Sequence, residues 1–159
     1  MELLQNKTTH PEAPGPDLAW RFAGAWLRIA RIMRCGLDQA FSGEEDFNAK
    51  DYFLLRWIHD GLHYPGALSE QTMMPASMIS HQLERLLRAG WLSRQIDRQD
   101  ARRTRFELTE TGRKALERGD RLVGEVIQSY LARVPLERRE EFISSCERLA
   151  EGPTGASHV

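Results

Sequence analysis

Residues 78–112 constrain the fold of this 159-residue chain more than any other part of its sequence. Apolar residues first recur at spacings of three and four, and Gly90 follows them, which is typical of a helix that ends at a left-handed residue. Two short runs with strand-like alternation come next, at 91–97 and 103–108, joined by a polar turn crowded with arginine. Thr109 then caps another helical pattern. This order predicts a helix, a small basic hairpin and a further helix.

A short helix is also predicted immediately before this segment. The chain breaks at Pro65-Gly66, and a helix is expected at 67–73. Because proline is tolerated in a first helical turn, Pro75 can start the next helix, which is expected at 75–89. Two short helices joined by a tight turn form a helix-turn-helix, in which the second is the recognition helix. The predicted buried stripe of that helix consists of Ile79, Leu83, Leu86 and Leu87.

The buried stripe leaves a polar face outward. Its residues are Ser77, Met78, His81, Gln82, Arg85 and Arg88. The residues nearest the N-terminus of a recognition helix enter the major groove of duplex DNA. Gln82 suits adenine and Met78 suits a thymine methyl group, whereas Arg85 and Arg88 lie farther along and are expected to contact phosphates. Taken alone, the same pattern would also fit the solvated face of an ordinary amphipathic helix.

The hairpin favours the DNA interpretation. Its cations are Arg94, Arg98, Arg102, Arg103 and Arg105. The whole chain has a formal net charge of -1, and acids collect in other segments, so the basic region is local, as the footprint of a nucleic acid should be. Arg98, Arg102 and Arg103 are expected to reach the DNA backbone or a narrow minor groove, and Asp100 is spaced to brace Arg102. The predicted partner is therefore double-stranded DNA.

The segments on either side of this region are predicted to be helical. A long helix is expected at 17–41, and nothing else in so short a chain could cover its whole apolar stripe, so we expect a second copy of the chain against it. Asn48 is expected to cap the next helix, with Phe47 and Tyr52 at the positions of a hydrophobic staple. After the hairpin two more helices are expected. The last begins at Pro135 and is expected to bury Leu136, Phe142, Ile143, Cys146 and Leu149.

In these features the sequence resembles the MarR family of winged-helix transcription regulators, over about 47–148. The residues that carry the resemblance are Ile79-Ser80, Leu86, Gly90-Trp91-Leu92, Arg94, Asp97, Asp100-Ala101-Arg102 and Leu108-Thr109-Glu110-Thr111-Gly112. The chain departs from the family pattern at Met73-Met74-Pro75, which replaces the common glycine turn, and at His81, where many members have arginine.

The resemblance implies a mostly α fold with a small β-hairpin wing, in the α+β class. This is a winged helix-turn-helix with N- and C-terminal dimerisation helices. The organisation expected is a flexible arm at 1–16, a dimerisation helix at 17–45, a DNA-binding lobe at 46–109, C-terminal dimerisation helices at 110–151 and a flexible tail at 152–159. The resemblance further implies an obligate homodimer whose two recognition helices bind a palindrome, with Arg102 reaching the DNA from the wing. Such regulators are more often repressors than activators.

Large aromatic residues cluster on the first two predicted helices, at Trp20, Trp26, Tyr52 and Trp57. The core and the dimer interface would account for them. Alternatively, they line a pocket for a small aromatic or lipophilic effector between the dimer helices and the DNA-binding lobes. Effectors of this family commonly change the spacing of the recognition helices, so the resemblance implies a ligand-responsive regulator.

Metal and redox sensing are alternatives that rest on single residues. His59 and His63 have the i,i+4 spacing of a metal pair, but Gly61 interrupts the helix and no further ligand completes the set nearby, so no metal site is predicted. Cys35 lies in an apolar stripe beside Arg34, which fits either a redox sensor or a buried, inert thiol.

Other functional classes find little support in the sequence. It contains no Gly-rich phosphate loop and no nucleophile elbow, so neither an enzyme nor a bound cofactor is expected. A winged helix that makes only protein contacts is the alternative to one that binds DNA. No apolar run approaches the roughly 18 residues of a membrane span, and the N-terminus lacks the basic start and hydrophobic run of a signal peptide. We expect a cytoplasmic protein with no membrane partner.

Overall fold

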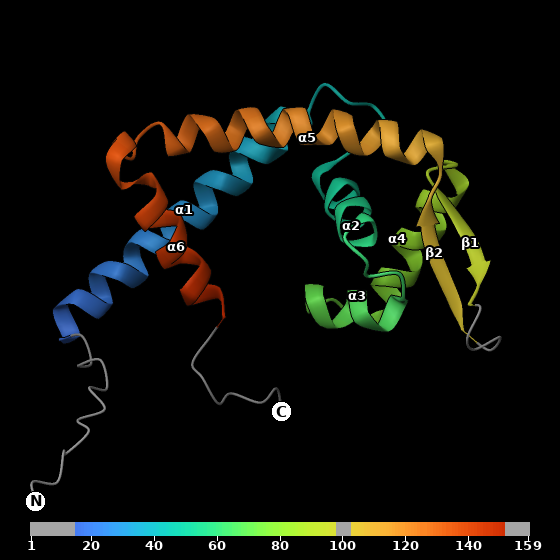
Figure 1. Ribbon diagram of the computed structural model, residues 1–159, viewed down its shortest axis with the longest axis horizontal. Helices are drawn as coiled ribbons and strands as arrows, with labels where there is room; N and C mark the ends of the chain where they lie inside the picture. Colours follow the sequence, from blue (N-terminus) through green and yellow to red (C-terminus); the bar gives the residue numbers. More distant parts are fainter. Residues whose placement is uncertain (1–14, 98–102, 152–159) are drawn as a thin grey trace, which may run out of the picture. The chain divides into compact units, whose positions relative to one another are not determined.

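The computed structural model describes residues 15–97 and 103–151 of the chain. These ranges form helices and one two-stranded antiparallel sheet (Figure 1). The helices are α1 (Pro16–Ala40), α2 (Ala49–His59), α3 (Pro65–Thr72), α4 (Ala76–Arg88), α5 (Glu110–Leu131) and α6 (Arg139–Ala150), and a 3-10 turn, η1 (Leu136–Arg138), precedes α6. The strands are β1 (Leu92–Ile96) and β2 (Thr104–Leu108). The predicted fold class, mostly α with a small hairpin, is confirmed.

Some predictions concern residues outside the described ranges. These residues are the expected N-terminal arm, apart from its last two residues, the C-terminal tail at 152–159, and the hairpin tip with Arg98, Asp100 and Arg102.

The chain divides into two compact units, residues 1–35 and 36–159. The described part of the first unit is most of α1, a helix that buries none of its residues. Its exposed large apolar side chains are Leu18, Trp20, Phe22, Trp26, Leu27, Ile29 and Ile32. A single chain therefore leaves much of the apolar side of this helix in contact with water, and exposed apolar surface of this kind marks interaction sites. Neither α1 nor any other described helix is long and apolar enough to cross a membrane.

The core of the second unit is built mainly from α2, α3, α4, the hairpin and the start of α5. Its most buried apolar side chains are Phe47, Leu54, Leu55, Ile58, Leu68, Ile79, Leu83 and Leu86. Asn48 caps α2 as predicted, because its side-chain oxygen accepts the backbone N–H groups of Lys50 and Asp51 at 3.0 and 3.2 Å. Phe47 and Tyr52, the predicted staple residues, are both buried. The predicted apolar stripe of α4 thus faces this core.

The C-terminal helix differs from the prediction that its apolar residues are buried. None of the residues of α6 or η1 is buried. Leu136, Phe142, Ile143 and Leu149 are exposed, and Cys146 is half-buried. The physical reason is that α6 makes its main contacts with the short η1 turn, so its apolar side is left uncovered by the core of its own unit.

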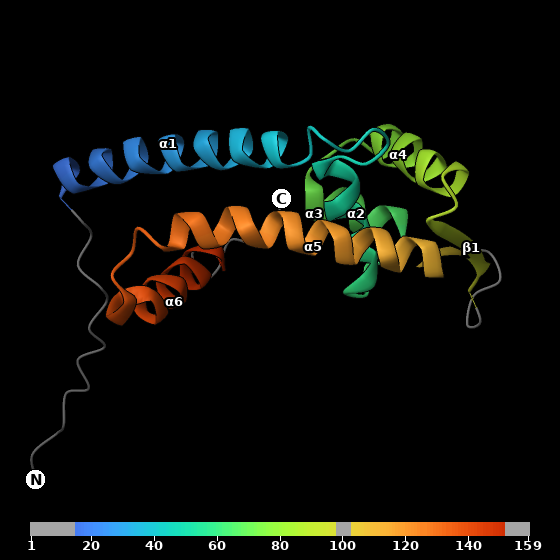
Figure 2. The same ribbon diagram turned by 90° about the horizontal axis from the view of Figure 1, so that it is seen from above.

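The first turn of α5 packs closely on the start of the hairpin (Figure 2). The Thr109 hydroxyl oxygen accepts the Gly112 N–H at 3.0 Å and donates to the Gly90 carbonyl at 2.7 Å. A Cβ atom at Gly112 would lie 2.0 Å from the Trp91 carbonyl oxygen, so a side chain does not fit there. Within the hairpin, Leu92 pairs with Leu108, and the ladder runs to Ile96 and Thr104.

Candidate nucleic-acid interface

The turn between α3 and α4 is closed by side chains. α3 ends at Thr72 and is followed by the capping residue Met73, which has a left-handed backbone (φ 52°) and is 92% exposed. The Ser69 hydroxyl donates to the Met74 carbonyl at 2.6 Å. The Thr72 hydroxyl donates to the Leu68 carbonyl at 2.8 Å and accepts the Met74 N–H at 3.2 Å. These bonds show how the chain forms the turn with methionine where a glycine is common.

α4 presents most of its predicted polar face to solvent. Ser77, Met78, His81 and Arg88 are exposed, whereas Gln82 and Arg85 are half-buried. Ile79, Leu83 and Leu86 lie on the opposite, buried side. The exposed residues of the first two turns are those that a recognition helix brings nearest to base edges.

Arg85 lies in a charged contact that sequence analysis did not anticipate. Its guanidinium forms an ion pair with Asp51, a fully buried residue in the first turn of α2. The other carboxylate oxygen of Asp51 accepts the Asn48 backbone N–H at 3.0 Å, which completes a capping box. The Arg85 Nε–H also donates to the side-chain oxygen of Gln82 at 3.4 Å. Arg85 and Asp51 lie far apart in the sequence and on different helices, so no local pattern could reveal the pair.

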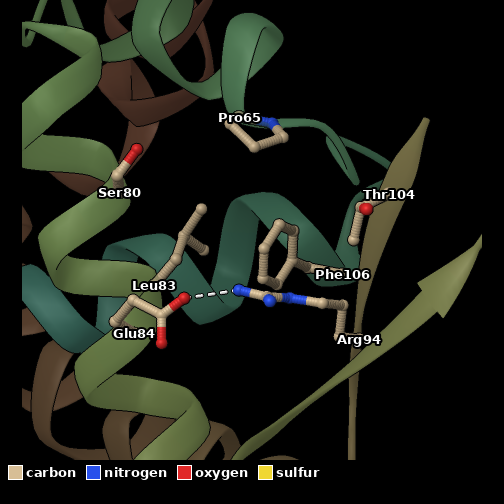
Figure 3. A pocket seen from close by; sticks show the side chains of 7 residues that line it. All are labelled: Pro65, Ser80, Leu83, Glu84, Arg94, Thr104 and Phe106. Carbon is tan, nitrogen blue, oxygen red and sulfur yellow. Dashed lines mark hydrogen bonds and ion pairs between the residues drawn. The ribbon is translucent and has the colours of Figure 1, made fainter. Parts of the chain in front are cut away.

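A small pocket of about 200 Å³ lies between α4 and the hairpin (Figure 3). Its lining residues are Pro65, Ser80, Leu83, Glu84, Arg94, Thr104 and Phe106. Glu84 on α4 forms an ion pair with Arg94 on β1, and the Arg94 guanidinium lies 5.7 Å from the centroid of the Phe106 ring. Each charged side chain is about half exposed, so the pair contributes modestly to stability. It nevertheless joins α4 to the hairpin.

The hairpin is attached to the start of α3 through residues that follow the end of β1 and precede the start of β2. The Tyr64 hydroxyl donates to the carboxylate of Asp97, and the Arg103 guanidinium lies over the Tyr64 ring at 4.1 Å from its centroid. The backbone N–H of Phe106 donates to the His63 carbonyl at 2.8 Å, and the His63 Nδ1 atom lies 3.0 Å from the Phe106 carbonyl oxygen. The hydrogen bond to Asp97 raises the pKa of Tyr64 above its ordinary value. These contacts form the hairpin anchor and hold Arg103, a predicted DNA contact, in a defined place.

The four predicted effector-pocket aromatics divide between the two units. Trp20 and Trp26 are exposed on the part of α1 that belongs to the first unit, so their grouping with the other two stays a prediction. Tyr52 is buried in the core of the second unit, and its hydroxyl donates to Asp120 at 3.0 Å. Burial raises the pKa of this phenol. Trp57 is half-buried and packs against the core.

The predicted alternatives of metal and redox chemistry rest on His59, His63 and Cys35. His59 is exposed at the end of α2, and His63 belongs to the hairpin anchor. In residues 15–97 and 103–151, no three His, Cys, Asp or Glu side chains are grouped so that they could hold a metal ion. Cys35 is exposed and Cys146 is half-buried, and both are free thiols.

The fold matches that of solved DNA-binding regulators. No protein-family model matches the chain, and no curated protein does. The MepR–DNA complex of S. aureus is 20% identical, covers 83% of this chain and 98% of its own, and superposes with a TM-score of 0.67. Apo MarR from E. coli is 20% identical over 80% of this chain and 93% of its own, with a TM-score of 0.64. The PcaV transcriptional regulator from Streptomyces coelicolor, in complex with its natural ligand, is 22% identical over 78% of this chain and 90% of its own, with a TM-score of 0.61.

These likenesses define a class of fold. The chain has the winged-helix fold of MarR, and the resemblance to MarR-type regulators that the sequence indicated is confirmed at the level of the fold.

Proposed function

We propose that this chain is a double-stranded DNA-binding transcription regulator that acts as a homodimer on a palindromic site. The observation that carries the proposal is the exposed polar face of α4, which stands beside a hairpin rich in arginine. The fold is shared with MepR, which has been solved as a DNA complex. The proposed base contacts are Ser77, Met78, His81 and Gln82, and the proposed backbone or minor-groove contacts are Arg88, Arg98, Arg102 and Arg103.

The uncovered apolar side chains support the homodimer. α1 exposes tryptophan, phenylalanine, leucine and isoleucine side chains along its length, and α6 exposes Phe142, Ile143 and Leu149. Covering apolar surface stabilises a complex by about 25 cal/mol for each Å² removed from water, so association with a partner that covers these side chains is favourable. A second copy of the chain would supply a matching apolar surface, because the same residues face outward on both copies.

We further propose that a small aromatic or lipophilic effector controls DNA binding and that the regulator is a repressor. PcaV, which has the same fold, has been solved with its natural ligand. Exposed Trp20 and Trp26 and half-buried Trp57 offer flat apolar surfaces that suit such a molecule. An effector needs a preference on the order of 1–3 kcal/mol for one spacing of the two lobes to change the affinity for DNA appreciably.

The experiment that tests DNA binding is fluorescence anisotropy with a randomised duplex pool at two salt concentrations, followed by recovery of the bound sequences. We expect a palindrome to be enriched and the affinity to fall steeply with salt, because bound phosphates release counterions. Arg88→Met should weaken binding, whereas Arg148→Met, which removes an exposed cation from α6, should not. Absence of any salt-dependent binding by the unmodified protein would overturn the proposal in favour of a protein-contact module.

A further inference from the structure

We propose that Arg85 is a positioning residue, which Asp51 holds in place and which in turn orients Gln82 toward the DNA bases. The three residues link the start of α2 to the reading face of α4. This inference rests on the proposed function, because it assigns roles within the same DNA-binding surface. In this role Arg85 does not contact a DNA phosphate, which is what the sequence alone predicted for it.

The first step is the commitment of Arg85 to Asp51. Asp51 has no exposed surface, and an unpaired carboxylate in such a place is strongly unfavourable. The Asn48 N–H donates a capping hydrogen bond to one carboxylate oxygen, and the guanidinium of Arg85 forms an ion pair with the other. Removing Arg85 from this contact to neutralise a phosphate would leave a buried charge without its partner. The ion pair therefore favours an inward position for the guanidinium.

The second step is the orientation of Gln82. A guanidinium carries only hydrogen-bond donors, so the Gln82 atom that accepts the Arg85 Nε–H must be the amide oxygen. The amide NH₂ group then points away from Arg85. In the major groove, a donor in that position matches the N7 acceptor of either purine and the O6 acceptor of guanine. The contact with Arg85 thus determines that Gln82 offers its amide NH₂ group, and not its amide oxygen, to the base.

Arg88 provides a matched contrast on the same helix. It lies one turn farther along, is exposed, and donates to the Glu84 backbone carbonyl at 3.3 Å. A bond to a neutral carbonyl leaves the positive charge available to a phosphate. The two arginines should therefore respond differently to substitution, although both lie on the outward side of α4.

The test compares Arg85→Lys, Arg85→Met and Arg88→Met in the full-length protein, on the duplex that the unmodified protein selects and on its single-base variants. Removing the Arg88 charge should lower the slope of log affinity against log salt by about one for each phosphate that is no longer neutralised, and should leave the base preference unchanged. Removing the Arg85 charge should leave that slope unchanged and alter the preference at one base pair of each half-site by about tenfold. Arg85→Lys keeps the charge beside Asp51 but lacks the planar fork, so it should show the same altered preference.

Two further variants separate positioning from a general loss of structure. In a Gln82→Ala background, Arg85→Lys should no longer change the base preference, because the side chain that it orients is absent. Asp51→Asn should reproduce the altered preference of Arg85→Lys, with far-ultraviolet circular dichroism confirming that the helices are intact.

The outcomes distinguish this inference from the proposed function. If Arg85→Met lowers the salt slope as Arg88→Met does, and Arg85→Lys restores both affinity and preference, Arg85 is a phosphate contact and the inference is overturned. The same holds if Arg85→Lys acts equally in the presence and absence of Gln82. If the unmodified protein selects no duplex at all, the proposed function fails, and the inference that rests on it fails with it.

Discussion

Single residues set how closely α5 can approach the rest of its unit. A Cβ atom at Gly112 would lie 2.0 Å from the Trp91 carbonyl oxygen, and one at Gly119 would lie 2.2 Å from the Tyr52 ring. Gly124, on the same helix, has nothing within 4 Å of an added Cβ. Gly112 and Gly119 therefore allow close packing that a side chain would prevent, whereas Gly124 has room for one.

We predict that Gly112→Ala lowers the free energy of unfolding by about 1–3 kcal/mol, because the backbone of Trp91 must move to admit a methyl group. Gly124→Ala is the control and should raise it by about 0.5–1 kcal/mol, since alanine is the better helix former. Both values can be measured by urea unfolding at one fixed protein concentration. Equal effects of the two substitutions would show that the contact between α5 and Trp91 is not tight in solution.

Met73 carries backbone strain at the turn of the helix-turn-helix. A non-glycine residue in the left-handed region costs roughly 1–2 kcal/mol relative to a right-handed one, and the exposed Met73 side chain gains little from packing. We predict that Met73→Gly raises the free energy of unfolding by on the order of 0.5 kcal/mol, after the larger entropy of an unfolded glycine is subtracted. Ala89→Gly, at an ordinary φ of -71°, should lower it in the same thermal or urea unfolding assay. Loss of stability in Met73→Gly would mean that the methionine side chain makes contacts that outweigh the strain.

At the scale of whole elements, the sequence indicated where most helices and strands begin and end. Asn48 and Thr109 form caps, and Gly90 takes the left-handed conformation (φ 72°) that ends α4. These signals are local, because each depends on residues within one helical turn. The spacing of Ile79, Leu83 and Leu86 likewise determines which face of α4 is buried.

The side-chain contacts between elements could not be predicted in the same way. Periodicity places Arg85 on the outward side of α4, yet its long side chain reaches back to Asp51 on α2. Tyr64 and Asp97 are 33 positions apart and meet only because the hairpin folds beside the start of α3. The prediction that the apolar side of α6 is buried was wrong for a related reason. An apolar stripe predicts that a helix face is buried, but it does not show whether the residues that bury it come from the same chain or from another.

The hairpin anchor makes a prediction about pH. The native state favours the protonated Tyr64 phenol, which donates to Asp97, so the native pKa lies above the unfolded value of about 10. Its stabilising contribution is therefore complete below a pH of about 10 and is lost as the pH rises through the native pKa. We predict that Tyr64→Phe unfolds at a lower urea concentration than the unmodified protein between about pH 7 and 9.5, and that the difference disappears at higher pH. If the difference in urea midpoint instead stays constant up to the highest pH at which both proteins fold, the hydrogen bond to Asp97 does not couple the protonation of Tyr64 to stability.

At the scale of the whole molecule, the apolar side chains of α1 should determine the oligomeric state. Trp26 and Ile29 are 56% and 45% exposed in the single chain and carry no charge that would favour solvent. We predict that Trp26→Glu, alone or with Ile29→Glu, shifts the protein toward a monomer in sedimentation-velocity experiments, because a dimer would bury the new carboxylates. Gln39→Glu adds the same charge at an exposed polar position of α1 and should leave the dimer intact. A stable dimer in both variants would place the interface elsewhere.

The oligomeric state and the mode of DNA binding can then be tested together. A dimer on a palindrome neutralises phosphates at both half-sites, and the dependence of affinity on salt scales with the number of phosphates neutralised. A monomeric Trp26→Glu variant keeps all of the proposed DNA contacts on α4 and the hairpin, because these elements belong to the second unit. We therefore predict that it binds the palindrome far more weakly, with about half the salt slope, yet binds an isolated half-site as well as the unmodified protein does. Anisotropy titrations on the two duplexes measure both quantities. An unchanged slope on the palindrome would mean that one chain occupies the full site and that the second copy has another role.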